Sequence, residues 1–141
     1  MNALSNSIEK RLNELDERLL RLESLRENSL NDFLTDPFLR DIAERNFEVA
    51  IQCCIDIANR ILALHGIQPP NEARYAFLKL AELDILPPDF AKQLMPMAGF
   101  RNILAHEYLD INWNIVYSFF QSLDDFKRFG ALIRAWLSQT H

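Results

Sequence analysis

The stretch GFRNILAHEY, residues 99–108, combines apolar and polar side chains in a way that decides the fold of this 141-residue chain. Placed on a helix at about 100° per residue, it separates into two faces. Three apolar residues share the face that suits a core: Phe100, Ile103 and Leu104. The other face carries Arg101, Asn102 and His106, and Tyr108 returns to within about 20° of Arg101 two turns later. The stretch therefore predicts a helix that packs on one side and is polar on the other.

The composition of the chain favours an all-α fold. Hydrophobic residues make up 49% of the sequence and only three residues are glycine, so turns are scarce and long helices are expected. The length suits a single domain over residues 1–141 with its own core. The formal net charge of −5 argues against a general polyanion binder, because such binding relies on many lysines and arginines. Any contact with nucleic acid must therefore be local.

The sequence is that expected of a soluble cytoplasmic protein. Cys53 and Cys54 are its only cysteines, and they adjoin each other in an apolar run, which suits buried, reduced thiols. The N-terminus does not resemble a signal peptide, and no apolar run approaches the roughly 20 residues of a membrane span. We therefore expect no contact with a membrane.

Apolar periodicity predicts two long helices ahead of the 99–108 stretch. The first covers residues 5–30, with apolar residues spaced alternately by four and three: Ile8, Leu12, Leu15, Leu19 and Leu22. This spacing fits either ordinary packing in a bundle or a short coiled-coil seam. The second helix begins after Asp36, a predicted N-cap, and reaches His65. Gly66 is expected to end it in the left-handed conformation.

The rest of the chain predicts one short helix and two more long ones. Two proline pairs bracket the short helix, over residues 72–83. The next helix starts near Asp89 and carries the polar cluster, and Pro96 within it predicts a kink or a late start. Asp110 is expected to cap the last helix, over residues 111–137.

Familiar catalytic and metal-binding patterns are missing from the sequence. It has no glycine-rich phosphate loop, no His-Glu-x-x-His or Cys-x-x-Cys spacing, and no histidine next to a serine or cysteine nucleophile. A triad assembled only in space stays open. We therefore expect neither a dedicated metal site nor a cofactor.

An arginine and a histidine on one face suit phosphoryl chemistry on RNA. The ribose 2′-hydroxyl can attack the adjacent phosphorus, so the protein needs only to move protons and stabilise charge. An imidazole transfers protons near neutral pH, and a guanidinium binds phosphate through two hydrogen bonds. Asn102 is placed to orient His106. Because one histidine cannot easily serve as both acid and base, a twofold dimer is attractive.

A purely structural interpretation of the same residues stays open. In it Arg101 pairs with a nearby carboxylate, His106 caps a helix end and Tyr108 is an interfacial ring. The five-residue spacing of arginine and histidine does not by itself establish a nuclease.

The pattern Arg101-Asn102-x3-His106-x-Tyr108 resembles the Arg-x4-His-x-Tyr motif of HEPN-domain proteins, specifically the HepT-like toxins. Three further segments look like that family: Glu44-Arg45 to Ala58-Asn59-Arg60, Pro69-Pro70 to Tyr75-Ala76-Phe77, and Met97-Ala98-Gly99-Phe100. The resemblance covers residues 35–125. The long N-terminal helix of residues 1–34 precedes the region of resemblance, and we expect it to belong to the dimer or antitoxin surface.

The resemblance implies an antiparallel HEPN-type bundle of about four long helices and one short helix. It implies a homodimer with facing motif helices, acting as a metal-independent endoribonuclease and as the toxin of a type VII-like toxin–antitoxin pair. Arg101 and His106 would be catalytic and Asn102 supporting. The antitoxin would be an MntA-like minimal nucleotidyltransferase that AMPylates Tyr108. Whether tRNA or mRNA is cut stays open.

Two alternatives use the same sequence differently. The chain could be a non-catalytic HEPN module that binds and regulates a nucleotidyltransferase. It could also be an interaction protein whose first helix pairs with a partner helix, which only the leucine spacing of that helix supports.

Overall fold

The structure, a computed structural model, describes residues 3–106 and 109–140, and these form helices and turns without strands. The helices are α1 (Ala3–Leu25), α2 (Leu30–Thr35), α3 (Pro37–Leu64), α4 (Arg74–Glu82), α5 (Pro88–His106), α6 (Trp113–Ser118), the 3₁₀ helix η1 (Phe119–Ser122) and α7 (Leu123–Thr140). The all-α prediction is confirmed.

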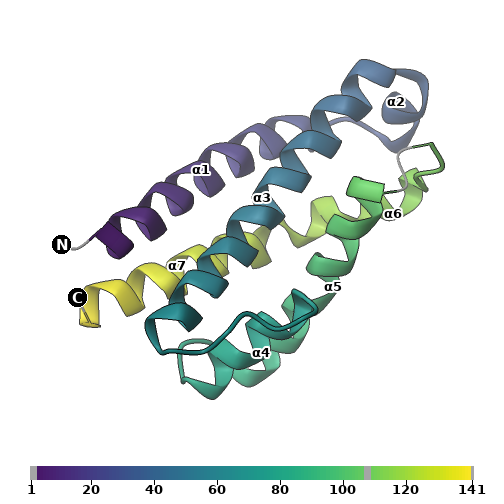
Figure 1. Cartoon of the computed structure of the whole chain (residues 1–141). Coiled ribbons are helices and arrows are strands. Elements are labelled where there is room, and N and C mark those ends of the chain that lie inside the picture. The colour runs from purple at the N-terminus through teal and green to yellow at the C-terminus, as the bar shows by residue number, and fades with distance from the viewer. Residues whose placement is uncertain (1–2, 107–108, 141) are drawn as a thin grey trace.

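The long helices α1, α3, α5 and α7 alternate in direction along the chain, so α3 is antiparallel to α1 and α5, and α2 and α6 lie at the end of the bundle opposite the two termini (Figure 1). Helix α3 is central, since it packs against α1, α4, α5 and α7. The short α4 lies along α5. The predicted set of four long helices and one short helix is therefore present, and α2, α6 and η1 are additional to it.

Helix α1 buries its apolar stripe within the chain. The leucines and the isoleucine that define the stripe are all at most 3% exposed: Ile8, Leu12, Leu15, Leu19 and Leu22. They pack between α3 and α7, as ordinary bundle packing requires. The stripe is thus not free to pair with a partner's helix.

The predicted first helix ends too late. Helix α1 stops at Leu25, and a separate helix, α2, follows. The Ser29 hydroxyl accepts a hydrogen bond from Asp32 N at 3.1 Å, and the Asp32 carboxylate accepts one from Ser29 N at 2.8 Å. This capping box starts a new helix where the apolar pattern alone continues to Leu30.

The predicted ends of α3 are confirmed. Asp36 Oδ1 accepts hydrogen bonds from Phe38 N at 3.0 Å and from Leu39 N at 3.3 Å, so the carboxylate caps the helix. At the other end Gly66 has a φ of 70°, as expected for a left-handed residue after the C-cap His65.

The last predicted helix is divided, and its predicted cap is wrong. Helices α6, η1 and α7 follow one another, and Asn112 caps α6 by accepting a hydrogen bond from Asn114 N at 3.0 Å. Asp110 is exposed and precedes this cap. Within this region Phe119 stacks on Phe100, and Phe120 meets Phe47 edge-on.

Helix α5 runs without a break from Pro88 to His106 and passes through Pro96. The late start suggested by this proline is therefore wrong. Cys53 and Cys54 are free thiols and buried, as predicted. No helix in the described ranges has the length and apolar character needed to cross a bilayer.

Candidate functional site

The site begins with an aromatic anchor in α5. Phe100 is 2% exposed, and its ring stacks on Phe119 with 3.9 Å between ring centroids. Phe47 of α3 meets the same ring edge-on at 5.5 Å. These contacts fix the rotation of α5 about its axis, so they also fix the directions in which the polar residues that follow leave the helix.

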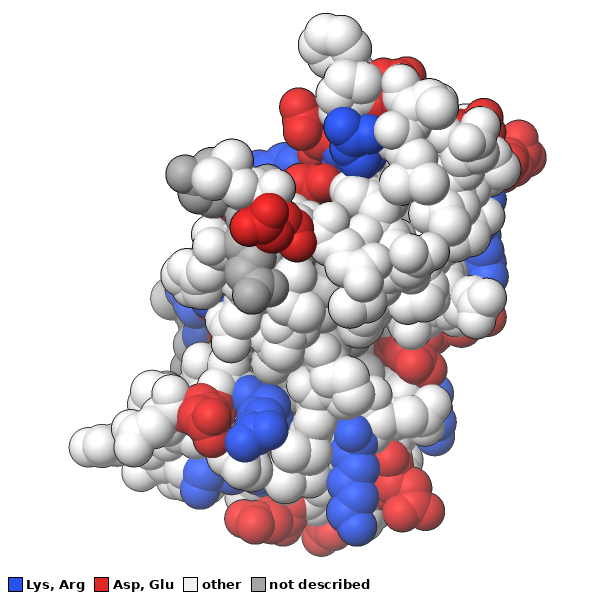
Figure 2. Space-filling view, turned by 90° about the vertical axis from the view of Figure 1, so that its right-hand side faces the viewer, with Lys and Arg blue, Asp and Glu red and all other residues white. Residues whose placement is uncertain are grey.

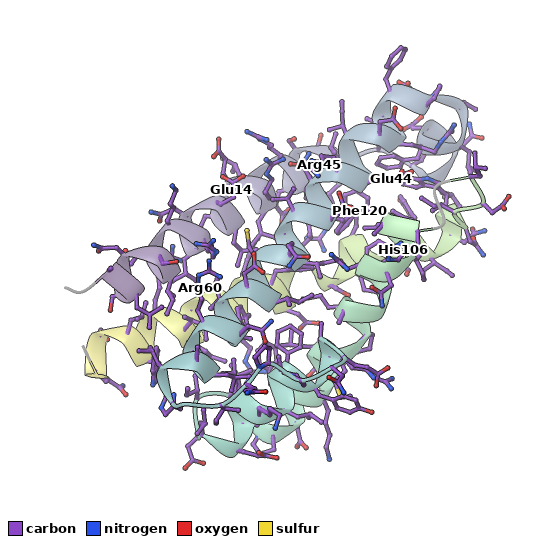
Figure 3. The ribbon with its side chains drawn as sticks, viewed as in Figure 1. Glu14, Glu44, Arg45, Arg60, His106 and Phe120 are labelled. Carbon is purple, nitrogen blue, oxygen red and sulfur yellow. The ribbon has the colours of Figure 1, made fainter. Side chains whose placement is uncertain are left out.

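The predicted polar residues lie on the solvent side of α5. Arg101 is half-buried, whereas Asn102 and His106 are exposed. Figure 3 shows His106 near the end of the helix. The Arg101 guanidinium donates a hydrogen bond to Asn102 Oδ1 at 3.4 Å. Tyr108, the predicted site of AMPylation, lies outside the described residues.

Arg101 has no neutralising partner among the described residues. Within residues 3–106 and 109–140 no carboxylate forms an ion pair with it, and its only hydrogen bond there goes to the neutral Asn102. The structural interpretation in which a described carboxylate neutralises Arg101 is therefore wrong. The side chain also borders two hollows, one on each flank of α5.

One hollow, called here the α4–α5 groove, separates α5 from the start of α4. It holds about 340 Å³ and is lined by Asn71, Glu72, Ala73, Arg74, Ala98, Gly99, Arg101 and Asn102. Arg74 donates hydrogen bonds to Glu72 Oε2 and to the Tyr75 hydroxyl, both at 3.2 Å. The groove is thus bordered by two guanidinium groups, two carboxamides and one carboxylate.

The other hollow, called here the α3–α5 groove, holds about 390 Å³. It is lined by Arg45, Glu48, Val49, Gln52, Cys53, Asp56 and Arg101. The polar side chains from α3 form hydrogen bonds with one another. Arg45 donates one to Glu48 Oε1 at 2.9 Å, and Gln52 donates one to Asp56 Oδ1 at 2.9 Å. Arg101 is therefore the cation of this groove that no described carboxylate neutralises.

A polar contact outside the motif ties α3 to α6. The Trp113 indole donates a hydrogen bond to Glu44 Oε2 at 2.9 Å. Burial raises the pKa of the Glu44 carboxyl above its ordinary value, the hydrogen bond from Trp113 opposes the rise, and the neighbouring Asp41 adds to it. A hollow of about 310 Å³ adjoins this pair, lined by Leu34, Arg40, Glu44, Leu109, Ile111 and Trp113.

Apolar side chains are exposed at the same end of the bundle. Large hydrophobic residues of α2, α3, α6 and the segment before α6 face solvent there: Leu34, Phe38, Ile42, Leu109 and Ile115. Figure 2 shows, on this side of the molecule, a broad area in which few charged residues lie. Leu109 follows Tyr108 directly in sequence.

The sequence predicted the motif residues but neither groove. The residues that line the grooves opposite Arg101 come from residues 71–74 and from α3, far away along the chain. No local periodicity links such segments. In the described part of the chain, no three His, Cys, Asp or Glu side chains are grouped so as to hold a metal ion.

Two curated relatives cover most of the chain. The tRNA nuclease HepT of Aphanizomenon flos-aquae is 36% identical over 110 residues, which is 78% of this chain and 75% of the relative. The mRNA nuclease HepT of Shewanella oneidensis is 33% identical over 106 residues, which is 74% of this chain and 80% of the relative.

A solved structure has the same fold. The tri-AMPylated Shewanella oneidensis HEPN toxin, in complex with MNT antitoxin, superposes with a TM-score of 0.82 at 29% identity and covers 96% of this chain and 99% of its own. The HEPN-type bundle expected from the motif is therefore confirmed. The family model described as Ribonuclease HepT-like matches residues 9–133, so the chain belongs to the HepT-like ribonuclease family.

Proposed function

We propose that this chain is the toxin of a toxin–antitoxin pair and acts as a metal-independent endoribonuclease. The observation that carries the proposal is the polar side of α5, where the half-buried Arg101 and the exposed Asn102 and His106 follow the core-anchored Phe100. Arg101 is not neutralised by any carboxylate in the described ranges. The nuclease names of two relatives that are more than 30% identical add support.

The chemistry requires only groups that the chain carries. The ribose 2′-oxygen attacks the adjacent phosphorus and gives up its proton, while the 5′-oxygen leaves and takes up a proton. The products are a 2′,3′-cyclic phosphate and a 5′-hydroxyl. Arg101 binds the phosphate oxygens as negative charge develops on them, and His106 transfers a proton at the attacking or leaving oxygen. Asn102 supports the orientation of these groups.

The reaction needs two proton transfers, and the motif of one chain holds one histidine. A homodimer in which two motif helices face each other supplies one imidazole as base and the other as acid. It also brings two copies of Arg101 to one phosphate. This doubles the positive charge at the site of a chain whose formal net charge is −5.

The antitoxin in this proposal is a minimal nucleotidyltransferase that AMPylates Tyr108. Support comes from the Shewanella oneidensis HEPN toxin, which is tri-AMPylated and in complex with MNT antitoxin. Tyr108 stands seven residues after Arg101, two turns on if the helix continues. A phosphate-bearing adduct there would place negative charge beside the guanidinium and compete with RNA. The exposed Leu109 is the neighbouring residue that the partner would meet.

The test is cleavage of total RNA in EDTA by purified protein. Wild type should cut RNA and leave cyclic phosphate ends, and His106→Ala should be inactive. The cleavage rate of Arg101→Ala should be lower by about 100-fold or more, which is the usual effect of removing a group that stabilises the transition state. His65→Ala and Arg21→Ala are matched controls, because His65 caps the far end of α3 and Arg21 is an exposed arginine of α1. Both controls should cleave like wild type.

Two results would overturn the proposal. If folded Arg101→Ala and His106→Ala proteins cut RNA as fast as wild type, the motif is not the active site. If wild type fails to cut RNA while mass spectrometry finds Tyr108 unmodified, the chain is a non-catalytic HEPN module that regulates its nucleotidyltransferase. Growth arrest on expression without that partner separates the same two functions in cells.

A further inference from the structure

Gly99, a glycine of α5, has no packing role among the described residues. Gly99 is exposed between the buried Ala98 and Phe100. A Cβ built on it would meet no described atom within 4 Å, and its φ is not in the left-handed range. Since glycine destabilises a helix interior relative to alanine, neither packing nor backbone geometry accounts for it. A bare backbone at an exposed position permits close approach by a group from outside the chain.

The surroundings of Gly99 define what could approach. The residue lines the α4–α5 groove, whose volume of about 340 Å³ falls at the small end of the range for ligand sites and suits one nucleotide. The carboxamides of Asn71 and Asn102 each offer a donor and an acceptor, and Glu72 offers an acceptor. Such groups match the edges of nucleobases.

The charges of the groove favour a nucleotide over a helix of a second copy. Arg101 extends into it without a carboxylate partner among the described residues. Arg74 forms an exposed ion pair with Glu72 at 3.2 Å and a hydrogen bond to the Tyr75 hydroxyl, so its charge stays in contact with solvent. Packing a second helix here would bury these groups and leave them without water. A phosphate-bearing strand would instead satisfy both guanidinium groups.

Building on the proposed ribonuclease function, we propose that the α4–α5 groove binds the nucleotide next to the scissile phosphate. The ribose and base lie across Gly99, Arg101 holds the scissile phosphate, and Arg74 contacts the neighbouring phosphate. Asn71 and Glu72 contact the base edge and so determine which nucleotide is accepted beside the cut. The groove is thus the specificity subsite of the enzyme.

The first experiment measures RNA binding with a short fluorescent 2′-fluoro RNA, which lacks the attacking hydroxyl and cannot be cut. Gly99→Ala should weaken binding at least fivefold, because the added methyl group occupies the floor of the groove. Gly130→Ala is the matched control, since Gly130 is also helical and an added Cβ makes only ordinary contacts, at 3.8 Å or more, with Leu12, Leu15 and Arg134. The control should bind within twofold of wild type.

The second experiment measures base preference by sequencing the products from a randomised RNA pool. Asn71→Ala and Glu72→Gln should change the preference at one position beside the cut and leave the other positions as they are. Circular dichroism checks that each variant folds, and both glycine variants should melt at or above the wild-type temperature.

Each other outcome overturns a distinct claim. If wild type cuts RNA and Gly99→Ala binds and cuts equally well, the subsite is refuted and the ribonuclease stands. If Gly99→Ala converts a dimer to monomers in sedimentation while Gly130→Ala does not, a second copy occupies the groove. If wild type neither binds nor cuts RNA, the proposed function fails and the subsite with it.

Discussion

Replacing Phe100 by alanine tests whether the core beneath the motif is packed as described. The side chain is 2% exposed, stacks on Phe119 and meets Phe47 edge-on. A buried phenylalanine removes roughly 150–250 Å² from water, which at about 25 cal/mol per Å² sets an upper limit near 4–6 kcal/mol. Alanine keeps the Cβ, so we expect the free energy of unfolding to fall by about 3–5 kcal/mol.

The assay is urea unfolding followed by circular dichroism at one protein concentration, because self-association makes apparent stability concentration-dependent. Phe38→Ala is the matched control, since that ring is 79% exposed and its loss should cost less than about 0.5 kcal/mol. Phe100→Leu is the second variant in case the alanine variant does not fold. Its free energy of unfolding should be lower than that of wild type by about 1–2 kcal/mol, because leucine cannot make the ring contacts. Equal losses for Phe100→Ala and Phe38→Ala would refute the reasoning.

Three further predictions concern residues outside the motif. Burial raises the pKa of Glu44 in the folded protein, so the stability of the fold decreases as the pH rises and this carboxyl ionises. Glu44→Gln should therefore melt at or above the wild-type temperature at pH 7, and the difference should vanish below about pH 4. A lower melting temperature of the variant at pH 7 would contradict this. Burial raises the pKa of Cys53 to about 11 and that of Cys54 well above its ordinary value, so iodoacetamide at pH 8 should label neither thiol in the native protein and both in guanidinium, by mass spectrometry. Gly66→Ala should lower the free energy of unfolding by about 1 kcal/mol in urea, because alanine is strained at a φ of 70°, and unchanged stability would argue against that backbone conformation.

Helix ends were predictable where the sequence carries a specific cap. Helix α3 begins after Asp36, whose carboxylate caps it, and ends before Gly66, which adopts a left-handed conformation. Few other residues favour these two conformations, so both ends could be predicted. The end of α1 was missed because its apolar pattern runs on to Leu30, which packs against the core from the next helix. The spacing of apolar residues indicates which side of a segment is buried. It does not reveal a turn between two helices when the residues on both sides of the turn are buried in the same core.

The candidate site was predictable only as far as one helix reaches. Periodicity placed Arg101, Asn102 and His106 on the polar side of α5, and their exposure agrees. The grooves beside Arg101 depend on how α5 packs against α3 and on where the loop before α4 returns. Both depend on tertiary packing, so the local sequence around Asn71 and Arg74 does not indicate that these residues line a groove.

The anchoring of Phe100 explains why the groove residues occur where they do. On a helix each residue turns by about 100°, so with Phe100 directed into the core its two neighbours lie on opposite flanks and Asn102 points nearly straight out. The exposures match, since Arg101 is half-buried while Gly99 and Asn102 are exposed. A rotation of α5 would change the position of Arg101 relative to both grooves, because the side chain borders each of them. A substitution at Phe100 should therefore impair RNA cleavage through the direction of Arg101, although the ring itself lies in the core and cannot touch the substrate.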